Sequence, residues 1–223
     1  MASLFVCWVN VGSGASVGYT TTALPALQHP NSKLFITGSE GSLVAALLML
    51  GAFIGGMLAG PLISLGRKRA LCLVSLPLSL AWLLIGFAQN IWYLYVSHFI
   101  LGACLGIVAD ASQLYVIEAV SSQWRGALGY IPVLMFNVGA LICYIAGSWL
   151  GWEELAFFGC LLTCPALLMP LIFPESPSYL VEQEKVKEAI SALRWLRGPN
   201  YDITAEYQVR RSFNCTIKVC KNK

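Results

Sequence analysis

The chain has 223 residues, of which 57% are hydrophobic and only 11% are charged, and its formal net charge is +3. Soluble globular proteins carry roughly 25% charged residues, so this composition excludes an ordinary water-soluble domain. The mean hydropathy of +0.70 indicates a chain whose side chains mostly face lipid. Because a helix needs about 20 mostly apolar residues to cross a bilayer, the hydrophobic runs determine the predicted architecture.

Six hydrophobic runs follow one another along the chain and predict six membrane-spanning helices. They lie at residues 2–24, 42–63, 70–88, 91–116, 127–150 and 155–173. The first run has no basic segment before it, which argues against a cleaved signal peptide. The predicted fold is therefore an all-α membrane protein, a six-transmembrane-helix bundle whose partner is the lipid bilayer.

The first run is more polar than the others. Its polar residues are Asn10, Ser13, Ser16, Tyr19, Thr20, Thr21 and Thr22. Polar side chains in a membrane span normally face the interior of the bundle or a water-filled cavity. We therefore expect this helix to line a central cavity. The candidate substrate contacts are Tyr19, Thr20 and Thr21 in this run, together with Asn137 in the fifth run.

Glycines recur at four-residue spacing in the second and fourth runs. The pairs are Gly51 with Gly55, Gly56 with Gly60, and Gly102 with Gly106. Within lipid, such small residues let two helix backbones approach closely. The spacing predicts tight helix–helix packing at these positions.

The positive charges are distributed unequally between the two sides of the predicted bundle. Of the fourteen Lys and Arg residues, all except Lys33 fall in segments that share the side of the N-terminus. Lys and Arg concentrate in cytoplasmic loops, so both termini are predicted to be cytosolic. The basic tail follows a membrane domain and lacks interleaved aromatic residues, so no nucleic-acid partner is expected.

The pattern changes beyond residue 173. Apolar residues recur at helical spacing from Tyr179 to Leu196, with charged residues between them, and Gly198 followed by Pro199 ends the pattern. These features predict an amphipathic helix at the cytosolic membrane surface. The chain is accordingly divided into a transmembrane bundle at 1–173, a segment with this helix at 174–198, and a divergent basic tail at 199–223.

The residues that usually carry chemistry are not arranged for it. Six of the eight cysteines lie inside predicted spans, where a thiol behaves as a small apolar group. The other two, Cys215 and Cys220, have no histidine nearby. No catalytic set converges at one membrane depth, so we expect no enzyme, no metal site and no cofactor.

Three strings carry a resemblance to a known family. They are GRKR at 66–69, the segment from Glu118 to Arg125 and Gly126, and PESPSYL at 174–180. Together they resemble the sugar-porter branch of the major facilitator superfamily, and the insect facilitated trehalose transporters in particular. The resemblance covers residues 12–207 and matches the N-terminal half of a protein with two six-helix halves. It implies facilitated transport of trehalose or a hexose across the plasma membrane.

The resemblance also implies a charge network at the cytosolic end. Its members would be Arg67, Lys68, Glu118, Arg125 and Glu175. In the family these charges form a conformational device rather than a catalytic site. From the residues alone, an acid and a base one loop apart could equally be an exposed pair, worth at most about 1 kcal/mol.

Other positions depart from the family pattern. His98 stands where the family has an arginine, and it either senses protons or is a neutral replacement that faces the bundle. Val133 stands where the family places a sugar-binding glutamine, and a valine offers sugar hydroxyls no hydrogen bond. Asp110 either couples transport to a proton gradient, pairs with a polar neighbour inside the bundle, or marks a chain released from selection.

A non-transporting membrane protein is the alternative function. In this interpretation the chain is a truncated isoform or fragment that at most associates with a full-length porter, or with a second copy as a homodimer. Alternating access requires one six-helix bundle to move against another. One half alone is therefore predicted not to carry sugar.

Overall fold

The computed structural model describes residues 7–30, 32–120, 123–168 and 174–197, and all regular elements in these ranges are helices. The predicted basic tail lies outside the described residues. The helices are α2 (Trp8–Leu27), α3 (Gly38–Ser64), α4 (Arg67–Gly86), α5 (Ile91–Ala119), α6 (Arg125–Leu128), α7 (Ile131–Gly147), α8 (Trp152–Leu167), α10 (Pro177–Glu182) and α11 (Val186–Arg197).

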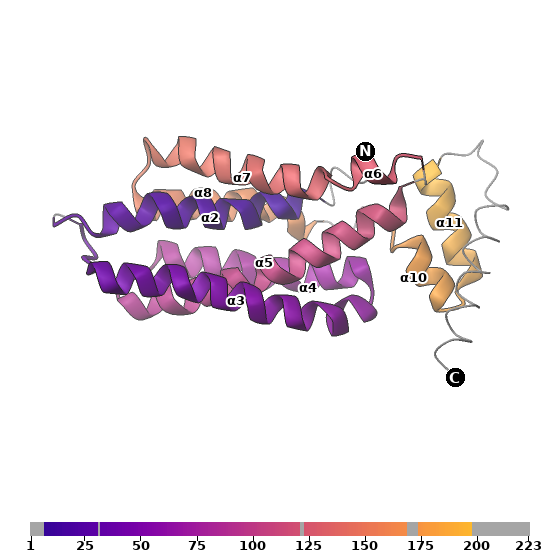
Figure 1. Ribbon diagram of the computed structural model, residues 1–223, viewed down its shortest axis with the longest axis horizontal. Coiled ribbons are helices and arrows are strands. Elements are labelled where there is room, and N and C mark those ends of the chain that lie inside the picture. Colours follow the sequence, from indigo (N-terminus) through magenta and orange to yellow (C-terminus); the bar gives the residue numbers. More distant parts are fainter. Residues whose placement is uncertain (1–6, 31, 121–122, 169–173, 198–223) are drawn as a thin grey trace.

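The long helices run side by side as an elongated bundle, and α10 and α11 lie together at one end of it (Figure 1). Four segments are long and apolar enough to cross a membrane: Gly38–Ser64, Arg67–Gly86, Ile91–Ala119 and Arg125–Gly147. The described part of the chain is thus all-helical, and its long apolar helices are those of a membrane protein. A count of six spans, which would add α2 and α8, stays a prediction.

Local capping explains why α3 begins before the predicted hydrophobic run. The Glu40 backbone N–H donates to Thr37 Oγ1 over 3.4 Å, and the Thr37 backbone N–H donates to Glu40 Oε2 over 2.7 Å. This reciprocal pair is a capping box, which satisfies backbone donors that the first helical turn would otherwise leave unpaired. The helix therefore starts at Gly38, four residues ahead of the apolar stretch that begins at residue 42.

Glycines bring the backbones of α3 and α5 into contact. A Cβ at Gly51 would collide with the Phe99 carbonyl oxygen, and one at Gly102 with that of Leu48. The same holds for Gly55 and Gly106, so the predicted close packing is confirmed at these four positions. It was wrong for Gly56 and Gly60, where an added Cβ would meet nothing within 4 Å.

A second glycine crossing joins α2 to α7. A Cβ at Gly14 would collide with the Phe136 carbonyl, and one at Gly139 would collide with the Val11 carbonyl. Gly18 stands four residues after Gly14 and packs on the same helix, since a Cβ there would come within 2.7 Å of the Ala140 carbonyl oxygen. The four-residue pattern therefore also occurs in α2, although it was not among the glycine pairs predicted to pack closely. Each crossing holds one pair of helices at close backbone distance: α3 with α5, and α2 with α7.

The polar residues of α2 mostly point into the bundle. Asn10, Ser13, Ser16 and Thr20 are all buried. The hydroxyls of Ser13, Ser16 and Thr20 donate to carbonyls about one turn earlier, for example Thr20 Oγ1 to Ser16 O over 2.8 Å. One contact crosses between helices, from Ser112 Oγ to Asn10 Oδ1 over 3.2 Å. Local bonds of this kind give the buried hydroxyls of α2 hydrogen-bond partners inside the bundle.

The predicted amphipathic helix is two helices. Glu184 lies between α10 and α11 with a φ of 61°, a left-handed conformation that continues neither helix. The Lys185 N–H reaches back to the Leu180 carbonyl over 3.0 Å and closes the end of α10. Leu180 packs with Ala189 and Ala192 of α11 in a small apolar cluster of its own.

Candidate functional site

The turn between α3 and α4 depends on Gly66. Its φ of 131° lies in a region that residues with a Cβ rarely adopt. An added Cβ would also come within 2.6 Å of Glu175 Oε2. The absence of a side chain allows the Glu175 carboxylate to approach the first turn of α4. There Glu175 Oε1 accepts from the Lys68 backbone N–H over 2.8 Å and from the Ser176 N–H over 3.0 Å. A helix N-terminus favours a carboxylate in this position.

Arg67 is the centre of a charge cluster at this end of the bundle. Its Nη2 and Nε lie 3.0 and 3.2 Å from Glu118 Oε1 at the end of α5, and its Nη1 lies 3.5 Å from Glu182 Oε2. The guanidinium also sits 5.4 Å from the centre of the Tyr179 ring, in reach of a cation–π contact. The Arg67 and Glu118 side chains are only 13% and 12% exposed, so solvent screens this pair less than a surface pair.

Hydroxyl groups connect the cluster to the backbone. Ser176 Oγ donates to Glu118 Oε2, and Tyr179 Oη donates to the Leu65 carbonyl over 2.8 Å. Tyr115 Oη donates to the Pro174 carbonyl over 3.1 Å. We call the set Arg67, Glu118, Glu175, Ser176, Tyr179 and Glu182 the Arg67 cluster. Its hydrogen bonds and ion pairs connect the α3–α4 turn and the end of α5 to residues 174–182.

The structure brings together some of the predicted network residues and not others. Arg67, Glu118 and Glu175 lie in the cluster, and Lys68 contributes its backbone N–H. Arg125 is exposed at the start of α6 and forms no ion pair with any residue that the structure describes. Sequence reasoning missed Ser176, Tyr179 and Glu182, although all three fall in or just after the string PESPSYL that it singled out.

The four candidate substrate contacts lie in two different environments. Tyr19 and Thr20 are inside the bundle. Thr21 and Asn137 are exposed, and they donate to backbone carbonyls of their own helices, Gly18 at 2.9 Å and Val133 at 2.8 Å respectively. The structure does not gather the four side chains around one space.

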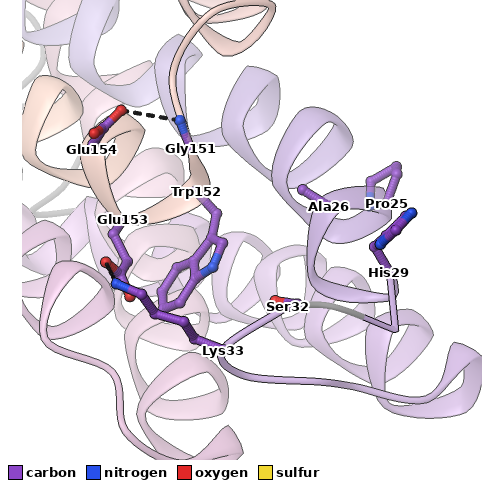
Figure 2. A pocket seen from close by; sticks show the side chains of 9 residues that line it. All are labelled: Pro25, Ala26, His29, Ser32, Lys33, Gly151, Trp152, Glu153 and Glu154. Carbon is purple, nitrogen blue, oxygen red and sulfur yellow. Dashed lines mark hydrogen bonds and ion pairs between the residues drawn. The ribbon is translucent and has the colours of Figure 1, made fainter.

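A pocket of about 790 Å³ opens at the other end of the bundle, between the end of α2 and the start of α8 (Figure 2). Lys33 Nζ lies 2.8 Å from Glu153 Oε2 across this pocket, and the hydrogen bond raises the pKa of the Lys33 ammonium. Trp152 lies beside the pair and is mostly buried. Because Lys33 is well exposed, the ion pair itself contributes little to stability.

Comparison with known proteins gives the family. The sequence model described as "Sugar (and other) transporter" matches residues 4–218. The chain belongs to this family of sugar transporters. The facilitated trehalose transporter Tret1 of Bombyx mori is 40% identical over 202 residues, which are 89% of this chain and 39% of that protein. Tret1 of Polypedilum vanderplanki is 35% identical over 208 residues, 92% of this chain and 41% of that protein.

Solved structures show the same fold. The xylose transporter XylE from E. coli, in a partially occluded inward-open conformation, matches with a TM-score of 0.81 at 19% identity. The match covers 94% of this chain and 56% of XylE. The helices of this chain therefore have the major facilitator fold, and they correspond to about half of the XylE chain. The chain spans about two fifths of the length of the two Tret1 relatives. The family consists of transporters rather than enzymes.

Proposed function

We propose that this chain is the N-terminal half of a facilitative sugar transporter for trehalose or a hexose. The observation that carries the proposal is the 40% identity with the Bombyx mori trehalose transporter across 89% of this chain. The lipid bilayer, specifically the plasma membrane, is the proposed location. The proposal includes six spans within residues 1–173. Four are the segments whose length and composition fit a membrane, and α2 and α8 are the other two.

The proposed topology has both termini in the cytosol. The unequal distribution of Lys and Arg supports it, since Lys33 at the α2–α3 connection is the one basic residue on the opposite side. The Arg67 cluster would then lie at the cytosolic end, together with α10 and α11 in the proposed segment 174–198. The remaining residues, 199–223, are proposed to be a basic cytosolic tail.

The Arg67 cluster is proposed to make this half of the transporter a rigid unit. It connects the α3–α4 turn, the end of α5 and residues 174–182 through hydrogen bonds of 2.8 to 3.5 Å. Rocking of two halves around a central site needs each half to move as one body. Arg125 and the Lys68 side chain are proposed to take part when the second half is present.

Substrate contacts are proposed on the exposed part of the candidate set. Thr21 and Asn137 are open to the surroundings and carry groups that can hydrogen-bond sugar hydroxyls. Tyr19 and Thr20 lie inside the bundle, and we propose that they support the α2 segment that presents Thr21.

A chimeric transporter tests the proposed function. The corresponding N-terminal segment of Bombyx mori Tret1 would be replaced by this chain, and uptake of labelled trehalose and glucose would be measured in cells without their own sugar uptake. We expect saturable uptake of one of the two sugars. A chimera that reaches the membrane in normal amount but takes up neither sugar would overturn the proposal. Unmodified Tret1 serves as the matched control.

A further inference from the structure

Three polar aromatic side chains meet in the core of the bundle. Tyr19 of α2, Trp82 of α4 and His98 of α5 are 1%, 0% and 1% exposed. The Tyr19 and Trp82 rings are perpendicular with centroids 5.5 Å apart, and the centroids of the Tyr19 and His98 rings are 6.0 Å apart. We call these residues the Tyr19 cluster. None of them belongs to the Arg67 cluster or to the exposed pair of candidate substrate contacts, Thr21 and Asn137.

The polar atoms of the Tyr19 cluster have no protein partner. Tyr19 Oη, Trp82 Nε1 and His98 Nε2 are buried without a hydrogen bond to any residue that the structure describes. Buried polar groups in folded proteins nearly always have a partner, so each such atom requires an explanation. Because the Tyr19 ring contacts both of the other rings, one small partner beside it is the simplest common explanation for the three atoms. A buried water typically makes about three hydrogen bonds to groups of this kind.

The donor and acceptor pattern defines what that partner is. His98 Nδ1 lies 2.9 Å from the Leu94 carbonyl, which can only accept, so Nδ1 donates and a neutral ring keeps a lone pair on Nε2. The indole of Trp82 only donates, whereas the hydroxyl of Tyr19 does both. The site thus presents one donor, one acceptor and one group of both kinds. A cation would be repelled by the indole N–H, and an anion by the imidazole lone pair.

We propose that Tyr19, Trp82 and His98 bind one buried water molecule that links α2, α4 and α5. The water accepts a hydrogen bond from Trp82 Nε1–H and donates one to His98 Nε2. Its remaining donor or acceptor bonds to the hydroxyl of Tyr19. A neutral molecule of this size satisfies all three groups, which no direct contact among the three rings does.

Magnetic resonance of the full chain in lipid nanodiscs tests the water site. With ¹⁵N-labelled Trp and His, we expect a cross-peak between the Trp82 indole proton and water, identified by its loss in Trp82→Phe. His98 should show the tautomer with its proton on Nδ1. Trp8 is the control, because its Nε1 already donates to the Leu162 carbonyl over 2.9 Å. Absence of the Trp82 cross-peak, or a direct bond from Trp82 to His98, would overturn the proposal.

The thermal stability of a second variant gives an independent answer. If the Tyr19 hydroxyl is bonded to water, Tyr19→Phe removes a hydrogen bond and should lower the melting temperature. If the hydroxyl were truly unpaired, its removal would relieve a cost and would raise the melting temperature or leave it unchanged, which would contradict the proposal. Tyr130→Phe at an exposed position is the matched control and should leave the melting temperature unchanged.

Discussion

Arg67 lies at the centre of the charged contacts in the cluster. Its guanidinium contacts two carboxylates and one aromatic ring at once. The planar guanidinium with five donors suits such a site, where a lysine could offer only a point charge. Since the Arg67 and Glu118 side chains are mostly buried, loss of the cation would leave a carboxylate with little solvent to stabilise its charge.

Replacement of Arg67 should therefore destabilise the bundle strongly. We expect Arg67→Ala to lower the free energy of unfolding by about 3 kcal/mol, as for other largely buried pairs that lose one partner. Arg125→Ala is the matched control, with an expected effect within about 0.5 kcal/mol, because Arg125 is exposed. Denaturation of both variants in the same detergent measures the difference. Equal losses in the two variants would show that Arg125 belongs to the network.

Substitution of Val133 tests whether this position of α7 lies in the sugar site. The side chain is 50% exposed on α7, so a longer residue can be accommodated. In the chimeric transporter, Val133→Gln should tighten sugar binding roughly tenfold, because a sugar hydroxyl without a partner costs about 1–3 kcal/mol. Leu134→Gln, at the neighbouring exposed position, should have no such effect. Unchanged affinity in Val133→Gln would place Val133 outside the sugar site.

Sequence reasoning could group Arg67, Glu118 and Glu175 because their strings resemble a family. It could not assign Tyr19 and Thr20 to the interior. A threonine that bonds to its own helix, as Thr20 does to Ser16, has the same sequence pattern as one that faces a cavity. Which side of a polar helix is covered depends on its neighbours, and a single sequence does not specify them.

At the scale of the helices, the crossing of α3 and α5 depends on backbone contact. Gly55 and Gly56 are adjacent in sequence, yet a Cβ at Gly55 would collide with the Ala103 carbonyl while one at Gly56 would meet nothing within 4 Å. Four-residue glycine spacing predicts that a contact exists, and both glycine pairs in α3 satisfy the pattern. The face that packs is set by the position of α5, which explains why the prediction failed for Gly56 and Gly60.

These two glycines allow a matched comparison. Gly55→Ala should cost about 1–3 kcal/mol, because the helices must separate to admit the methyl group. Gly56→Ala should be neutral or slightly stabilising, since alanine is the better helix former and has room. Unfolding of the two variants under identical conditions decides between them. A Gly55→Ala bundle as stable as the unmodified one would show that the backbones are not in close contact.

At the scale of the whole molecule, the described surface is unusual for one that faces only lipid. Thr21, Asp110 and Asn137 are exposed on helices α2, α5 and α7. Hydrocarbon offers polar groups no hydrogen bonds, so such side chains at membrane depth require a protein partner or water. We propose that these exposed side chains are covered when a second six-helix half, a second copy of the chain or a full-length porter packs against the bundle.

The chain reconstituted alone should therefore not carry sugar. Alternating access moves one bundle against another around a site between them, and one bundle provides half of that site. We expect entry of labelled trehalose and glucose into liposomes containing the purified chain to equal that into empty liposomes. The chimera with the remainder of Tret1, in matched liposomes, is the positive control. If the chain alone gave saturable, inhibitor-sensitive uptake, two copies would have to form a complete site between them, and the exposed polar surface would be the contact between those copies.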